Sequence, residues 1–176
     1  FATRLLSAGF ACVDASIWTK EEIMNQLHEY EGLALRSRFK ITREEIDSAT
    51  KLKFIARAGA GLENIDQQEC AKRNIRIYNS PEGNSDAVGE HAIAMLLALM
   101  NHLIRSDREV RGGKWRRKEN TGHELNGSTV GIIGFGRMGR AFAQKLQGFG
   151  VKMLAYDKYL KDYAPEHVRE TSFDEL

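Results

Sequence analysis

The sequence has few of the residues that mark metal-binding or disulfide-bonded proteins. Its 176 residues include only two cysteines, Cys12 and Cys70. They lack the spacing of a metal site and are too few for a disulfide framework, so nothing indicates an oxidising compartment. We therefore expect a cytoplasmic protein with no metal site.

The chain also lacks a strong excess of one charge and any long apolar run. Its 26 Lys and Arg residues nearly balance 24 Asp and Glu residues, which leaves a formal net charge of +2. This balance gives no reason to expect a nucleic-acid partner. No apolar run reaches the roughly 18 residues that a membrane-spanning helix needs, so no membrane partner is expected. With 42% hydrophobic and 28% charged residues, the composition is that of an ordinary globular protein with a core.

Glycine, by contrast, is concentrated in one informative stretch, residues 128–157. The apolar run from Val130 to Ile133 predicts a strand, and the loop Gly134-Phe135-Gly136-Arg137-Met138-Gly139 follows it directly. A helix-like spacing of apolar residues comes next, and then a second short strand that ends at Asp157. This order is typical of the first half of a doubly wound Rossmann domain that binds NAD.

Each residue type in this loop has a physical reason to be there. Gly134 permits a sharp turn, Gly136 lets a pyrophosphate approach the backbone, and Gly139 lets the helix pack closely on the sheet. The free N–H groups at the start of the helix, around Arg137 and Met138, favour an anion. Asp157, about 20 residues further on, can accept hydrogen bonds from an adenosine ribose and repels a 2′-phosphate, so it favours NAD over NADP. The alternative is a glycine-rich turn without a ligand.

The sequence pattern of residues 1–82 predicts a separate α/β lobe in which short strands alternate with helices. This alternation indicates a parallel sheet. The stretch from Asn79 to Ser85 is rich in turn-forming residues and is expected to be a linker. Residues 83–176 are expected to form the second domain. The expected strands are residues 10–13, 32–35, 54–56 and 75–78. The expected helices include those capped by Thr19 with Glu22 and by Thr42 with Glu45, and residues 67–73.

A long helix is expected from about Asp86 to Ile104, capped by Asn84 or Ser85. It is apolar around most of its surface, which fits a helix buried between two lobes and also fits a homodimer interface. The charge-rich residues 105–120 that follow are either a solvated helix end and loop or a positive rim that attracts an anionic substrate.

Taken in order, these parts resemble the NAD-dependent D-2-hydroxyacid dehydrogenases over nearly the whole chain. The segments that carry the resemblance are Leu35-Arg36-Ser37-Arg38-Phe39-Lys40-Ile41-Thr42, residues 52–66, Asn79-Ser80-Pro81, Gly113-Lys114-Trp115, Glu124-Leu125-Asn126-Gly127 and the Gly134 loop. The resemblance implies a flavodoxin-like substrate lobe, an NAD-binding Rossmann domain and an active site between them. It also implies a small anionic 2-hydroxy or 2-keto acid as substrate, with the branch that oxidises 3-phosphoglycerate favoured.

The resemblance also implies substrate-binding residues in the first lobe. The family's loop at Gly59 and Ala60 holds the substrate carboxylate, and Ala60 touches the nicotinamide end of the cofactor. The residues themselves are consistent with this role, because a glycine-rich turn after a strand can aim its amides at an anion. Arg36 and Ser37 end the preceding strand and can donate to a carboxylate or phosphate. The alternative for the Gly59 loop is a tight turn without a ligand. The alternative for Arg36 and Ser37 is that they are ordinary residues at the end of a strand.

The family's catalytic Arg, Glu and His have no matching position in this sequence, so we name no catalytic residue. We expect an incomplete chain, with a substrate lobe that lacks its first strand and only the N-terminal part of the NAD-binding domain. Two other readings stay open: a non-catalytic NAD-sensing scaffold of the same fold, and a dehydrogenase of another acid. Formate is disfavoured because it offers no distal anion for Arg36 to hold.

Overall fold

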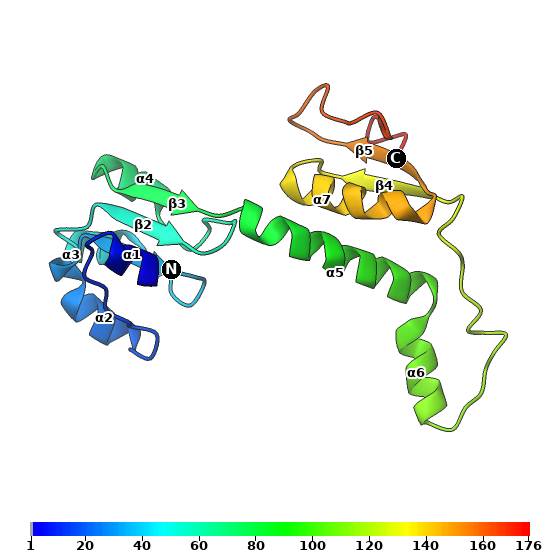
Figure 1. The fold of residues 1–176 in the computed structure, drawn as a ribbon, viewed down its shortest axis with the longest axis horizontal. Coiled ribbons are helices and arrows are strands. Elements are labelled where there is room, and N and C mark those ends of the chain that lie inside the picture. Colours follow the sequence, from blue (N-terminus) through cyan, green and yellow to red (C-terminus); the bar gives the residue numbers. More distant parts are fainter. Residues whose placement is uncertain (1) are drawn as a thin grey trace. The chain divides into compact units, whose positions relative to one another are not determined.

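The computed structural model describes residues 2–176, which form two compact units. The first unit ends at Ser80 and the second runs from Pro81 to Leu176. Each unit holds a three-stranded parallel sheet with helices packed against it (Figure 1). The α/β class with parallel sheets is therefore confirmed. The roles of the two units in substrate and cofactor binding stay predictions.

The sheet of the first unit has the strand order β1-β2-β3 and contains only parallel pairs. Its helices follow the expected alternation, and the bounds of β1 agree with the sequence-based prediction. The elements are α1 Ala2–Ser7, α2 Lys20–Gln26, the 3₁₀ turn η1 Leu27–Glu29, β1 Gly32–Leu35, α3 Arg43–Ser48, β2 Phe54–Arg57, α4 Gln67–Lys72 and β3 Arg76–Asn79.

Both predicted capping boxes of this unit are present. The Glu22 N–H donates to Thr19 Oγ1 at 3.2 Å, while Glu22 Oε2 accepts from the Thr19 N–H at 2.7 Å. The same reciprocal arrangement joins Thr42 and Glu45 at the start of α3. These bonds satisfy N–H groups that a helix start leaves without partners, so the short helices have defined beginnings.

The core of the first unit combines residues of the sheet and of its helices, and Ile46 of α3, Ile55 of β2 and Cys70 of α4 are fully buried in it. Residues 10–13, expected as a strand, are irregular and exposed. Their apolar residues match strand propensity, but no strand within residues 2–176 pairs with them, and propensity alone does not hold a strand together.

The second unit carries the strand order β4-β5-β6, again with parallel pairs. The sequence predicted β4 and β5 but missed β6, because three largely polar residues give no recognisable period. Residues 172–176 contain a turn at residues 174 and 175 and form no helix. The elements are α5 Glu82–Met100, α6 Leu103–Arg111, β4 Thr129–Ile133, α7 Arg137–Leu146, the 3₁₀ turn η2 Gln147–Phe149, β5 Lys152–Tyr156 and β6 Val168–Glu170.

The long helix differs from its prediction at both ends. It begins at Glu82, four residues earlier than expected, and neither Asn84 nor Ser85 caps it. It ends at Met100, where His102 adopts a left-handed backbone conformation with φ of 50° and α6 continues in a new direction. The segment that follows α6 stabilises the break between α5 and α6, because the His123 N–H donates to the Met100 carbonyl at 3.0 Å.

Helices α5 and α7 lie side by side and run in the same direction (Figure 1). Gly89 is buried at their contact, where an added Cβ would come within 3.0 Å of the Ala141 carbonyl carbon. Lys145 Nζ pairs with Asp86 Oδ1 at 2.7 Å and with Glu90 Oε1 at 3.4 Å. Close backbone contact and these ion pairs fix the register of the two helices.

Among residues 2–176, no single helix is long and apolar enough to cross a membrane. The pair α5 and α6 meets the length and composition criteria only when taken together, across a bend of 60°.

Candidate dinucleotide-binding site

The glycine loop leaves the carboxyl end of β4 and leads into α7. Gly134 adopts φ of +87°, a conformation that residues with a side chain rarely take, and its N–H donates to the Tyr156 carbonyl at 2.7 Å. Phe135 is fully buried, with its ring 5.4 Å from that of Tyr163. The turn is therefore attached to β5 by its backbone and to the core by its side chain.

The other two glycines of the loop meet different surroundings. A Cβ at Gly139 would lie 2.1 Å from the Gly134 carbonyl oxygen, so α7 approaches the loop more closely than any side chain allows. A Cβ at Gly136 would have no neighbour within 4 Å, so the space in front of this residue is open. Open space before the first turn of a helix is what an incoming phosphate group needs.

Asp157 lies at the carboxyl end of β5, next to this loop. Its Oδ2 accepts from the Phe135 N–H at 2.8 Å, and its Oδ1 accepts from the N–H groups of Tyr159 at 2.9 Å and Leu160 at 3.1 Å. Bonds from Tyr159, Leu160 and Phe135, in that order of size, lower the pKa of Asp157 below its ordinary value. The carboxylate is therefore ionised, and it has acceptor capacity beyond these three bonds.

Arg137 and Met138 form the first turn of α7. Met138 is half-buried, and Arg137 Nη2 lies 2.6 Å from Glu82 Oε1 at the start of α5. The first turn of α7 contains no acidic residue, and its N-cap, Gly136, provides no side-chain hydrogen bond. The amino end of α7 is thus electropositive, as an anion site requires.

The predicted substrate residues lie in the first unit, after β1 and β2. Arg36 and Ser37 have exposed side chains, and Asn64 Nδ2 fixes the loop after β1 by donating to the carbonyls of Arg36 and Phe39, each at 3.0 Å. Because β1 and β2 are adjacent and parallel, these residues leave the same edge of the sheet as Gly59 and Ala60.

The backbone of the Gly59 turn differs in part from the expectation. The Gly59 N–H donates to the Arg57 carbonyl at 2.9 Å, so this amide is already engaged. Within residues 2–176, the Ala60 N–H has no protein acceptor, while the Ala60 carbonyl accepts from Asn79 Nδ2 at 2.6 Å. The amide that can serve a carboxylate is therefore that of Ala60.

Sequence reasoning missed Arg57, the last residue of β2. Its side chain is only 11% exposed, and its Nη2 donates to Glu63 Oε1 at 3.1 Å. The guanidinium fills the space where Gly59 would carry a Cβ, and its Nε has no partner within the described part of the chain. A cation at the end of a strand, directly before a glycine turn, is the signal that could have pointed to it.

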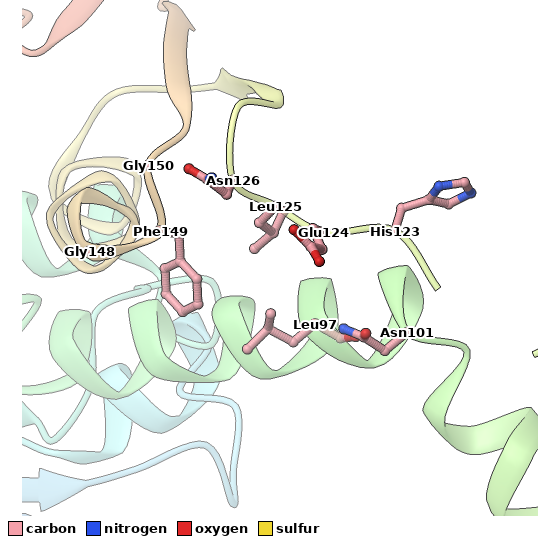
Figure 2. Close-up of a pocket in the computed structure, with 9 residues that line it drawn as sticks. All are labelled: Leu97, Asn101, His123, Glu124, Leu125, Asn126, Gly148, Phe149 and Gly150. Atoms are coloured by element: carbon pink, nitrogen blue, oxygen red, sulfur yellow. The ribbon is translucent and has the colours of Figure 1, made fainter. Parts of the chain in front are cut away.

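A separate hollow of the second unit lies away from the glycine loop. It is an open depression of about 540 Å³ beside the C-terminal half of α5, lined by Leu97, Asn101 and residues 123–126 and 148–150 (Figure 2). Those residues precede β4 and β5, whereas the glycine loop and Asp157 follow them. None of the predicted cofactor residues lines this depression.

Comparison with known proteins adds a family to this geometry. Residues 93–176 match the D-isomer specific 2-hydroxyacid dehydrogenase, NAD binding domain. D-3-phosphoglycerate dehydrogenase from Homo sapiens is 38% identical over 153 residues, which are 87% of this chain and 29% of that protein. Hydroxypyruvate reductase from Thermotoga maritima is 40% identical over 138 residues, which are 78% of this chain and 45% of that protein.

The solved structures agree with these sequence matches. The NAD-dependent formate dehydrogenase from Staphylococcus aureus, in complex with NAD, matches with a TM-score of 0.78 at 30% identity, over 89% of this chain and 48% of that chain. This chain thus spans less than half of each of these three relatives. Residues 93–176 therefore belong to the NAD-binding domain of the D-isomer specific 2-hydroxyacid dehydrogenase family, and most of the chain is similar in sequence or structure to the three relatives named above.

Proposed function

We propose that this protein is an NAD-dependent oxidoreductase that interconverts a D-2-hydroxy acid and its 2-keto acid. The observation that carries the proposal is the glycine loop, with open space before Gly136 and an ionised Asp157 next to it. In this reaction the carbon that bears the hydroxyl group would lose a hydride, which a bound nicotinamide would take up, and the hydroxyl group would release its proton. Gly134, Gly136, Arg137, Met138 and Gly139 would hold the pyrophosphate, Asp157 the adenosine ribose, and Ala60 the nicotinamide end.

The proposed substrate is 3-phosphoglycerate. Its support is the 38% identity with a D-3-phosphoglycerate dehydrogenase and the basic, hydrogen-bonding residues after β1 and β2. The substrate carries a carboxylate and a phosphate, so it needs two separate anion sites. We assign the carboxylate to the Gly59–Ala60 turn and the phosphate end to Arg36 and Ser37.

A second candidate substrate is hydroxypyruvate. The relative from Thermotoga maritima supports it, because a protein named for this activity is 40% identical over 138 residues. Hydroxypyruvate has the carboxylate and the keto group of the 2-keto acid that forms from 3-phosphoglycerate, but it has no phosphate. The two candidates therefore differ in whether Arg36 has a distal anion to bind.

We also propose that the protein is a homodimer through α5 and α6. Five apolar side chains on these helices are more than half exposed, namely Met95, Leu99, Leu103, Ile104 and Val110. Leu96, by contrast, packs against the core of its own unit. A row of exposed apolar residues along consecutive helices is typical of a subunit interface.

The test is NADH production by the full-length protein from a panel of D-3-phosphoglycerate, D-glycerate, D-lactate and formate, with NADP in parallel reactions. We expect the highest kcat/KM with D-3-phosphoglycerate and NAD. A higher value with D-glycerate would favour the hydroxypyruvate candidate. Tight NADH binding without turnover of any acid would indicate an NAD-sensing scaffold, and absence of NADH binding would contradict the proposal as a whole.

A further inference from the structure

The amino end of α7 already has an anion beside it, and that anion belongs to the protein. Glu82, the first residue of α5, places its Oε1 2.6 Å from Nη2 of Arg137. Both side chains are more than half exposed, at 60% and 58%. A carboxylate therefore occupies one edge of the guanidinium that stands at the entrance to the glycine loop.

The position of Glu82 is set by the packing of α5 on α7. Glu82, Asp86 and Glu90 are spaced four residues apart and share one face of α5. Lys145 binds the second and third of them, while Gly89 sits directly on Ala141. Because this contact leaves no room for sliding, Glu82 is presented to Arg137 at a fixed register.

An Arg that binds a phosphate group through two parallel N–H bonds needs a whole edge of its guanidinium. In this structure Nη2 is engaged by Glu82, so a pyrophosphate meets a partly occupied donor and a nearby negative charge. We propose that Glu82 is a positioning residue that lowers cofactor affinity, because its carboxylate competes with the cofactor's pyrophosphate for Arg137. This inference rests on the proposed NAD-dependent function and adds a residue that tunes it.

The experiment measures the dissociation constant of NADH for the full-length protein and its variants by fluorescence titration. Glu82→Gln keeps the shape of the side chain and removes its charge, so we expect NADH to bind about 2- to 5-fold more tightly, the range of an exposed ion pair. The gain should shrink at high salt, and ADP-ribose, which has the same pyrophosphate, should show it too.

Two further variants separate this role from a general change in charge. Glu90→Gln removes the same charge from the same face of α5, roughly 12 Å further from the loop, and should leave NADH affinity unchanged. In an Arg137→Gln background, Glu82→Gln should give a clearly smaller gain, because the contested donor is gone and only the repulsion between Glu82 and the pyrophosphate is removed. Adenosine, which has no phosphate, should bind equally to wild type and Glu82→Gln.

Each result bears on the inference. Unchanged or weaker NADH binding by Glu82→Gln would overturn it, as would an equal gain in the Arg137→Gln background or with Glu90→Gln. In those cases wild type still binds NADH, so the proposed function survives. If wild type itself does not bind NADH, the proposed function fails, and the inference fails with it.

Discussion

The backbone N–H of Phe135 donates to Oδ2 of Asp157 at 2.8 Å, which joins the glycine loop after β4 to the end of β5. Asp157 therefore has a role in the protein alone as well as the role we propose toward a ribose. It orders the loop through a backbone amide, and its two oxygens have acceptor capacity left for the hydroxyl groups of a ribose.

We predict that Asp157→Ala weakens NADH binding about 10- to 150-fold, the range for losing hydrogen bonds to a charged group. NADPH binding should weaken less, because the substitution also removes the charge that repels a 2′-phosphate. Parallel titrations with the two cofactors measure the ratio, with Asp174→Ala as the control. Equal affinities for NADH and NADPH in wild type would show that Asp157 does not select the cofactor.

The glycine loop offers a matched pair of substitutions. Gly139→Ala should lower the free energy of unfolding by about 2 kcal/mol or more, because the new Cβ would lie 2.1 Å from a backbone oxygen that cannot move aside. Gly136→Ala should leave the thermal unfolding midpoint nearly unchanged, since nothing lies within 4 Å, yet it should weaken NADH binding. Gly148→Ala, also in open space, is the control for both measurements. A normal midpoint for Gly139→Ala would contradict the close approach.

Acid should destabilise the first unit through Glu45. Burial raises the pKa of Glu45, but hydrogen bonds from Lys20 and Thr42 outweigh it and lower the pKa from 4.5 to about 2. Because the pKa of Glu45 is lower in the folded state, its ionised carboxylate stabilises the fold fully above about pH 5. This stabilisation is lost as the pH falls from there toward 2.

Glu45→Gln should therefore reduce stability at pH 7, by up to about 3 kcal/mol, and flatten the pH dependence in that window. Thermal unfolding between pH 2 and pH 7 provides the measurement. Glu44→Gln, at the exposed neighbouring position, should follow the wild-type curve. A Glu45→Gln curve parallel to wild type would mean that this carboxylate does not control the acid response.

The exposed apolar row on α5 and α6 makes Leu99, which is 72% exposed, the best probe of the proposed dimer. Leu99→Glu should give a monomer at micromolar concentration by light scattering, with a nearly unchanged unfolding transition, because a buried unpaired charge opposes association. Tyr159→Glu changes a side chain that is even more exposed, at 84%, and should not dissociate the dimer. A wild type that is already monomeric would contradict the interface.

Arg36 is the side chain that we assign to the phosphate end of the substrate. Arg36→Ala should lower kcat/KM for 3-phosphoglycerate about 10- to 150-fold, and lower it less for D-glycerate, which has no phosphate to lose. Arg38→Ala is the matched control, because Arg38 is stacked on Phe39, with its Cζ 4.6 Å from the ring centre. Equal losses on the two substrates would place Arg36 at the carboxylate instead.

Local signals in the sequence predicted the parts of the fold that local forces determine. The capping boxes at Thr19 and Thr42, the strand β1 and the turn at Gly134 depend on residues within a few positions of one another. The break at His102 could not be predicted, because apolar spacing continues through it and the contact that fixes it comes from His123. Long-range contacts of this kind leave no local period in a sequence.

The residues of the candidate site also fall into those that the sequence predicts and those that only the folded structure reveals. The glycines and Asp157 were found because each type of residue is needed for a backbone conformation or a charge at a fixed place. The ion pair of Arg137 with Glu82, and the packing of Arg57 against Gly59, join residues whose identity is ordinary and whose significance comes from contact. Such pairs become visible only when the chain is folded.

The contact of Gly89 with Ala141 has a mechanical consequence. Because α5 and α7 touch backbone to backbone and cannot slide past each other, the two helices form one rigid pair. In this pair, α5 begins at Glu82 and α7 begins at the glycine loop. Any displacement of α5 would therefore carry the glycine loop with it as a single piece, without altering the internal geometry of the loop.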